Sequence, residues 1–553
     1  MQRRASFLST LFIVYFALCA LHCAIALALP ADCLVYGEVR DIGTLCSRSG
    51  EILGRLDGRT TPEVLLSHLG GKIHSPALAG VDLSVPAHFW MLDPHKYTAP
   101  WVYAIRHTDH EAFEAGLDGW YAESTADAQN PVHHLRPPLA AARFLGYQFH
   151  VTDRVLLCTD TRAATAVAQW LQSEMQRAKP EMQFRCSGQI TLRLDVQRIL
   201  AVYGKEYAVQ VEEMKSRMRE AIERLGQRPD AEAGIVAAQK ELDRFATLVR
   251  DVSDVDIAFR MEPECATLVV DVQAVNGSIL DRAVRAHPRG STGLLMSCPA
   301  QATMVLCTNL SAAEAVGNML LRAVGSSALD ALRQAVAPES SMMVALMMTP
   351  EPNRVAQILE VRDGVTEAAT WARWDRFAAA EGAQPPAGTP FALRALPLPE
   401  GAPAGTRLAA VQLDQKLLGA AAARAVGRLF GATPLVAQRF AFPRSMAAVA
   451  LDPLALLARI DDFVKHPDQT LGSDPSLRQT LAGLPSAPNV LLYASPTGVR
   501  AWLALGGFKC GAPVAGELGF AGTVSLTEQG RVIGALRVPT GALKEALGSR
   551  EQH

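Results

Sequence analysis

The sequence predicts an α+β protein made of two tandem repeats, each an antiparallel or mixed β-sheet packed against helices. Three observations predict this class. Short segments that alternate apolar and polar residues, as strands do, lie between segments whose apolar residues recur at helical spacing. Similar segments return about 260 residues later. The 553 residues also exceed the length at which one core usually stops growing.

The clearest unit spans residues 242–284. A helical pattern comes first, then two alternating strands joined by a turn at Pro263-Glu264, and then Asn276-Gly277-Ser278 before a second helical pattern. A looser copy covers residues 523–547. The sequence of this unit predicts a structural role in sheet and helices, and it contains no catalytic motif.

The elements before this unit follow in order. Strands are predicted near residues 33–39, 101–105, 147–151, 155–158 and 189–194, and helices near 42–56, 62–69, 110–117 and 162–177. Asp109 and Asp195 each precede a helical pattern and are predicted N-caps. The stretch 127–138 is polar and rich in Pro and is a predicted loop. The stretch 384–405 is rich in Pro, Gly and Ala and is predicted to be either an exposed loop or a linker within the second half.

A helical hairpin is predicted near 206–252, with a break from Gly226 to Pro229. Its Glu, Lys and Arg residues stand at spacings that form ion pairs along a solvated helix face. Acidic and basic residues balance there, so a basic-helix function is not favoured.

The linker His287–Ser291 marks the predicted boundary between the repeats. The predicted organisation is a signal peptide at 1–28, a first repeat at 29–288 and a second at 289–553. The matched features include the starts at Leu29 and Cys298, the helix starts at Asp195 and Asp452, and those at Ser278 and Thr540.

The N-terminus predicts export. Arg3-Arg4 precede an apolar run, and Ala24-Ile25-Ala26 and Ala26-Leu27-Ala28 are small-residue cleavage sites. The protein is then periplasmic or extracellular, in a bacterial envelope. The alternative is an uncleaved membrane anchor, because the run is just long enough to span a bilayer.

Composition excludes some partners. The formal net charge is −2 and the pI about 6.7, which does not favour nucleic acid or an anionic membrane surface. Eight cysteines follow the signal segment, and their even number permits disulfides whose pairing the sequence cannot choose. Cys158, Cys265 and Cys307 lie in apolar runs that favour buried free thiols.

Several of these features together resemble a group of exported bacterial proteins with duplicated α+β domains of unknown function. They are the start Leu29-Pro30-Ala31-Asp32, the element Gly80-Val81-Asp82 with Pro86, the strand near 102–105 followed by Asp109, Phe113 and Leu117, and the 242–284 unit. The resemblance covers residues 29–288 better than the second half. It implies export and a repeated α+β build, and no activity, cofactor or catalytic residue.

One polar cluster is a candidate metal site. His107 and His110 lie near a predicted helix start, and Glu114 is one turn beyond His110, as zinc ligands would be. The motif HExxH is absent, and Asp109 within the cluster is better explained as a cap. His107, His110 and Glu114 are therefore weak candidates, and no cofactor is predicted.

Other site patterns favour structural explanations. Asp251, Asp254 and Asp256 crowd together, but the glycine and terminal glutamate of a calcium loop are missing, so helix capping and strand entry explain them better. Neither a Gly-x-Ser-x-Gly elbow nor a phosphate-binding GxxxxGK[ST] motif is present.

These observations predict an exported, non-enzymatic envelope protein that binds a protein partner or an apolar ligand. The first alternative is a metal-dependent hydrolase with a dispersed site around His107, His110 and Glu114. The second is a purely structural module of a surface assembly.

Overall fold

The computed structural model describes the chain over a set of ranges separated by gaps. They are residues 30, 32–57, 60–72, 78–98, 100–115, 121–127, 130–136, 147–151, 154–158, 161–175, 184–225, 239, 242–243, 246–286, 298, 302–309, 341–347, 354–360, 366–377, 391–413, 433–441, 444–450, 452–458, 470–505, 511–513 and 516–541. The predicted signal peptide and the linker His287–Ser291 lie outside these residues.

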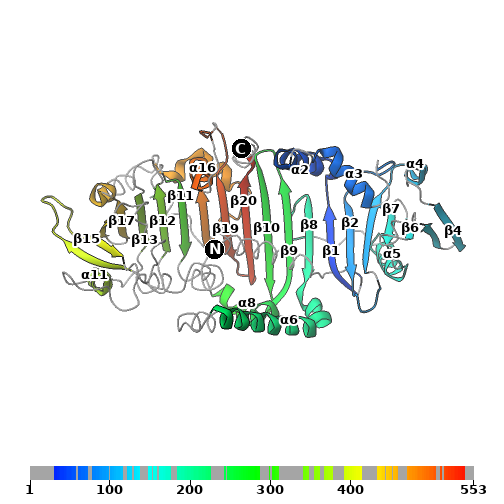
Figure 1. The fold of residues 1–553 in the computed structure, drawn as a ribbon, viewed down its shortest axis with the longest axis horizontal. Coiled ribbons are helices and arrows are strands. Elements are labelled where there is room, and N and C mark those ends of the chain that lie inside the picture. Colours follow the sequence, from blue (N-terminus) through cyan, green and yellow to red (C-terminus); the bar gives the residue numbers. More distant parts are fainter. Residues whose placement is uncertain are drawn as a thin grey trace. The chain divides into compact units, whose positions relative to one another are not determined.

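The chain forms two compact units. Unit 1 comprises residues 1–282 and 530–532, and unit 2 comprises residues 283–529 and 533–553. Both units combine antiparallel sheet with helices, which confirms the predicted α+β class (Figure 1).

Unit 1 is built on a sheet whose neighbouring strands pair antiparallel throughout the described residues. The spatial order is β10 (Cys265–Ala274), β9 (Val252–Met261), β8 (Ile190–Asp195), β1 (Cys33–Val39), β2 (Ala87–Leu92), β3 (Trp101–Arg106), β7 (Arg154–Cys158), β6 (Tyr147–Val151), β5 (Asn130–Arg136) and β4 (Tyr121–Asp127). Strand β1 therefore lies inside the sheet, between β8 and β2, and is buried along almost its whole length.

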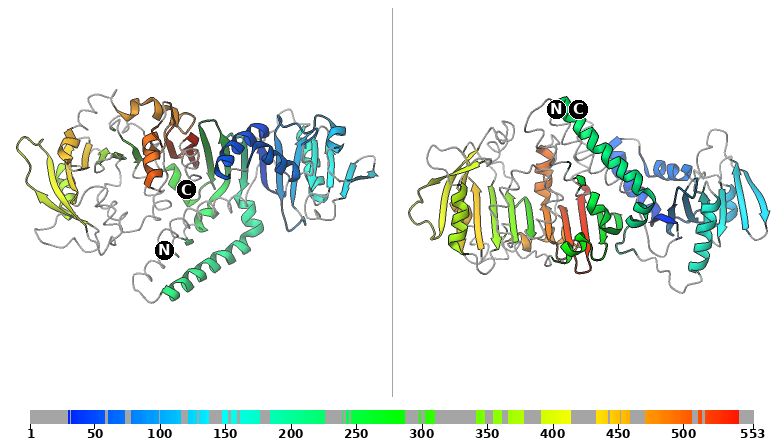
Figure 2. Two further views of the ribbon diagram at one scale, coloured as in Figure 1. Left: turned by 45° about the horizontal axis from the view of Figure 1, so that its top comes forward. Right: turned by 90° about the horizontal axis from the view of Figure 1, so that it is seen from below.

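Several helices in the described part of unit 1 connect or cover these strands. They are α2 (Ile42–Asp57), α3 (Pro62–Lys72), α4 (His110–Ala115), α5 (Thr161–Met175) and α6 (Val196–Leu225). A further helix, α8 (Ile279–Arg285), spans the boundary with unit 2. The main core forms where α5 packs on the sheet: Val167 and Leu171 join Trp90, Val102 and Leu156 there. Figure 2 shows α6 running away from the sheet of its unit.

Several helix starts agree with the sequence. The backbone N–H of Arg198 donates to Asp195 Oδ1 at 2.8 Å, so Asp195 caps α6. Asp109 accepts the N–H of Ala112 at 3.0 Å, and Asp452 accepts that of Ala455 at 3.0 Å. The hairpin helix ends at Leu225, next to the predicted break, but it begins at Val196 rather than near 206 because it continues directly from β8.

The described strands of unit 2 also pair antiparallel with their neighbours. Their spatial order is β20 (Arg531–Pro539), β19 (Phe520–Leu526), β18 (Val490–Ala494), β11 (Met304–Asn309), β12 (Ser341–Met347), β13 (Arg354–Glu360), β17 (Arg444–Ala450), β16 (Leu435–Ala441), β15 (Thr406–Leu413) and β14 (Phe391–Leu396). Helices α11 (Glu367–Phe377), α15 (Pro475–Leu481) and α16 (Pro496–Leu505) accompany them. Trp374 of α11 lies in a core cluster.

The strands of the two units have the same order. Each strand of unit 1 occupies the place of the strand numbered ten higher in unit 2. This order corrects one sequence match, since β18 rather than β17 takes the place of β8. The counterpart of Asp195 is therefore Ser495, whose Oγ accepts the N–H of Gly498 at 3.1 Å, and not Asp452. Descent of the halves from one repeat stays a prediction.

Two stretches predicted to be loop or linker contain strands. The stretch 127–138 holds β5, which pairs antiparallel with β4. The stretch 384–405 holds β14, paired with β15. In both cases Pro residues suggested a loop or linker, but Pro131 stands near a strand start, where a missing N–H is tolerated.

Within the described part of the chain, no helix is long and apolar enough to cross a membrane.

Candidate functional site

The densest polar cluster described in unit 1 lies on one face of strands β8, β9 and β10. Arg193 lies opposite Asp256, and Asp256 lies opposite Asp271, so the three side chains share a face. On β9 the residues of this face, including Asp254 and Asp256, are more buried than Val255 and Ile257 between them. A strand usually buries its apolar face and exposes its polar face, but on β9 the face that carries the charged residues is the more buried one.

Arg193 and Asp256 form the centre of the cluster. Nε and Nη2 of Arg193 donate to the two carboxylate oxygens of Asp256, both at 2.6 Å. This bidentate geometry is the strongest way for an arginine to bind a carboxylate. Asp256 is fully buried and Arg193 almost so, so each charge depends on the other for stabilisation.

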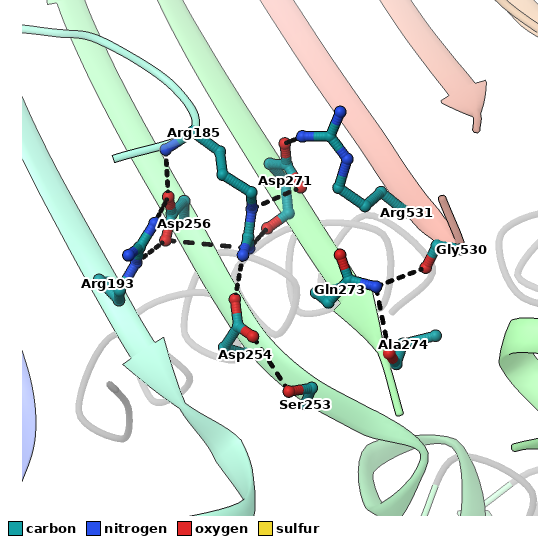
Figure 3. Close-up of polar contacts among 10 residues, drawn as sticks. All are labelled: Arg185, Arg193, Ser253, Asp254, Asp256, Asp271, Gln273, Ala274, Gly530 and Arg531. Atoms are coloured by element: carbon teal, nitrogen blue, oxygen red, sulfur yellow. Dashed lines mark hydrogen bonds and ion pairs between the residues drawn. The ribbon is translucent and has the colours of Figure 1, made fainter. Parts of the chain in front are cut away.

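Arg185 covers the cluster from the segment that precedes β8 (Figure 3). Its backbone N–H donates to Asp256 Oδ2 at 2.6 Å, and its Nε donates to Asp271 Oδ1 at 3.2 Å. Its Nη1 contacts Asp254, and its Nη2 donates to the backbone oxygen of Asp271 at 3.1 Å. One side chain therefore ties the segment around residue 185 to β9 and β10.

Arg531 completes the network. Its Nη1 donates to Asp271 Oδ2 at 3.0 Å, opposite the oxygen that Arg185 holds. Beside it, Gln273 of β10 directs its amide toward the backbone oxygens of Ala274 and Gly530 (Figure 3). Three guanidinium groups thus face three carboxylates, and the network is balanced in formal charge.

The electrostatics reflect this burial. Desolvation raises the pKa of the Asp271 carboxyl, and the charges of Arg185 and Arg531 oppose that rise. For Arg185, burial lowers the pKa, but the charges of Asp256 and Asp254 outweigh it and hold the pKa above its ordinary value. Arg185 therefore stays charged and remains bound to the carboxylates.

Aromatic side chains lie next to the charged cluster on the same face of the sheet. Tyr36 lies opposite both Arg193 and Trp90 on the same face. The ring of Phe184, next to Arg185, stacks on Tyr36 with centroids 5.3 Å apart, and the Arg193 guanidinium lies 5.7 Å from the Phe184 centroid. The hydroxyl of Tyr36 is 2.7 Å from Nδ1 of His88. Phe184 therefore packs on the aromatic side chain of Tyr36, and Arg185 binds the neighbouring carboxylates.

The arrangement of these arginines and aspartates is typical of a network that stabilises the fold. A general base needs a carboxylate or imidazole within reach of a substrate proton, whereas here guanidinium groups occupy the carboxylates under a covering segment. A buried network of this kind fixes strand register and the position of the covering segment, because any slip would leave a buried charge without its partner.

Among the candidate metal ligands, the side chain of His107 is described. The ring of His107 lies 6.5 Å from that of Phe113 and stacks on it. The side chains of His110 and Glu114 lie outside the described residues. In the ranges given above, no group of three or more His, Cys, Asp or Glu side chains could hold a metal ion.

The acidic triplet has two different explanations. Asp251 accepts the N–H of Leu280 at 3.1 Å and so acts at a helix start, as predicted. Asp254 and Asp256, however, belong to the buried network, so capping and strand entry were the wrong explanation for them. The signal in the sequence is the alternation of two aspartates along one strand: Asp256 lies opposite Arg193 and Asp271, and Asp254 lies two residues earlier on the same face.

The cysteines that are described are free thiols. Cys265 and Cys307 are buried, as the apolar runs around them predicted. Burial raises the pKa of Cys186 and of Cys307 to about 12. The side chains of Cys158 and Cys510 lie outside the described residues.

Comparison with known proteins adds little. No family model matches the sequence, and no curated protein matches it. A solved structure described as crystal form III of TP0453 is similar over 46% of this chain and 80% of that chain, with 6% identity and a TM-score of 0.23. A similarity at this level carries no argument about fold or function.

Proposed function

We propose that the protein is an exported, non-enzymatic envelope protein that binds a protein partner through helix α6. The observation that carries the proposal is the exposed face of this helix. Its 30 residues correspond to about 45 Å of helix, far more than the connection between two adjacent strands requires.

Among the described residues, the start of α6 is held to the sheet. Gln197 Nε2 donates to the backbone oxygens of Arg250 and Val252 at 2.8 and 2.6 Å. Ile199 lies in the core, and Val202 and Tyr203 pack against it. Farther along, Lys215 Nζ contacts Asp243 Oδ1 at 2.6 Å, which joins α6 to the second arm of the hairpin.

The opposite face of α6 is open to solvent. Val209 is 58% exposed, a high value for a β-branched apolar side chain. It shares a nearly flat surface with Ala208, Glu212, Glu213 and Ser216 of the same helix. Tyr207, Val211 and Met214 are half-buried on the other side of the helix. A small apolar centre with a polar rim is the pattern of a protein-binding surface.

The arginine–aspartate network supports the non-enzymatic part of the proposal. It is the densest polar cluster described in unit 1, and its arginines hold the carboxylates that a reaction would otherwise use. The N-terminal segment of the sequence supports export.

The test is site-specific photo-crosslinking in the producing cell. A photoreactive residue at position 209 is expected to form a covalent adduct with a protein, and the same residue at position 214 is the matched control on the half-buried face. Val209→Glu should then weaken binding of the captured protein. Absence of an adduct at 209, or equal adducts at both positions, would refute binding through this face.

A further inference from the structure

We propose that the partner of α6 is a second copy of this chain, bound antiparallel through the same helix face. This inference rests on the proposed function and names its partner. The two-fold axis lies between Ala208 and Val209, so that the same surface of each copy meets itself.

The contact surface is a stripe along α6. Ala201, Lys205, Ala208, Val209, Glu212 and Ser216 are all exposed and recur at spacings of three and four residues. Four of the six are small or apolar without a long side chain, which lets two helix axes approach closely. The stripe faces away from the half-buried side chains of Tyr207 and Met214.

The stripe is self-complementary when two copies run antiparallel. Around an axis between residues 208 and 209, Ala208 meets Val209 of the second copy at the centre. Lys205 meets Glu212, and Ala201 meets Ser216. Symmetry produces each pair twice, so two lysine–glutamate pairs flank a small apolar centre. Glu212 contacts Lys215 of its own helix at 2.6 Å, but it is 65% exposed, and its carboxylate is therefore also open to a lysine of the second copy.

The charge pattern also selects the direction. In a parallel pairing with the same register, Lys205 would face Lys205 and Glu212 would face Glu212, and like charges at this separation repel. Antiparallel pairing turns both repulsions into attractions. A single helix face on another is at the small end of specific interfaces, so the dimer is expected to dissociate on dilution.

The experiment is sedimentation velocity of the full chain, purified from a producing cell, over a wide concentration range. We expect a monomer–dimer equilibrium that weakens as salt is added, because exposed ion pairs are screened. Lys205→Glu should weaken the dimer about tenfold, since two attractive pairs become repulsive. The double variant K205E/E212K restores the pairs and should restore the dimer.

Arg217→Glu is the matched control. It makes the same change of charge on the same helix, at a side chain that is 80% exposed, but about a third of a turn away from Lys205. It should leave the dimer constant within about twofold.

Three results would overturn the inference: a monomer at every concentration, a dimer that Lys205→Glu does not weaken, or a double variant that does not recover. If position 209 crosslinks a different protein while the chain stays monomeric, the proposed function stands and the second-copy inference falls.

Discussion

Replacement of Arg185 by methionine tests whether the buried network holds unit 1 together. Methionine keeps much of the length and apolar stem of arginine but removes the charge. Arg193 would still hold Asp256, and Arg531 would still hold Asp271, while Asp254 would lose the guanidinium that contacts it. The covering segment at residues 184–187 would lose its main polar attachment.

The expected cost follows from the burial of these groups. Removal of one partner from a buried ion pair costs about 3–5 kcal/mol. Arg185 is 17% exposed and Asp254 12%, and partial solvation together with the remaining arginines places the expected value near the lower end, about 3 kcal/mol. The opening free energy of β9 and β10 should fall by that amount, which corresponds to roughly a hundredfold faster exchange.

Hydrogen exchange followed by mass spectrometry measures this opening strand by strand. Peptides that cover residues 252–274 should lose protection in R185M, and peptides that cover residues 520–526 of unit 2 serve as an internal control. Arg260→Met is the matched variant: Arg260 lies on the same strand, but its side chain is 40% exposed and 3.6 Å from Glu262. It should cost at most about 1 kcal/mol. Equal protection in R185M and the wild type would refute a structural role for the network.

Three further predictions concern capping, pH and thiols. Asp195→Ala should destabilise the first turn of α6 by about 1 kcal/mol, seen as faster exchange at residues 196–200, because the cap on the Arg198 N–H is lost; unchanged exchange there would contradict the capping role. Burial holds the pKa of Asp271 above its ordinary 3.8, so the folded state binds this proton more tightly than the unfolded chain. Its contribution to stability is therefore present in acid and is lost as the pH rises through the window above 3.8. Urea unfolding midpoints should show this fall in the wild type and a smaller one in Asp271→Asn, and identical slopes would contradict it. Alkylation with iodoacetamide at mildly alkaline pH should modify half-buried Cys46 before Cys307, whose thiol is buried and has a pKa of about 12; mass spectrometry of quenched samples gives the order, and early modification of Cys307 would contradict it.

Local patterns predicted local structure well. The helix expected at residues 42–56 is α2, and the hairpin expected around residues 147–158 consists of β6 and β7. Asp109, Asp195 and Asp452 cap helices as expected, because a cap depends only on a side chain and the backbone three residues away. Such signals are complete within a short stretch of sequence.

The network needed information that no short stretch contains. Asp256 gains its partner from Arg193, 63 residues earlier in the chain, and Asp271 gains one of its partners from Arg531, 260 residues later. Sequence distances of this size hide the pairing until strand order is known. The match of Asp195 with Asp452 failed for the same reason. Both residues follow a strand and cap a helix, and only the order of the strands tells which strand–helix junctions occupy equivalent places.

The shared strand order has a consequence for how this fold can change. Residues 196–251 connect β8 to β9, whereas only residues 495–519 connect β18 to β19, yet both pairs of strands are antiparallel neighbours. The length of this connection is therefore independent of the ladder that it joins. The connection at residues 196–251, which contains α6, can therefore be shortened to the length of the connection at residues 495–519 without a change of strand register. A protein built in this way can gain or lose a contact surface while its core stays the same.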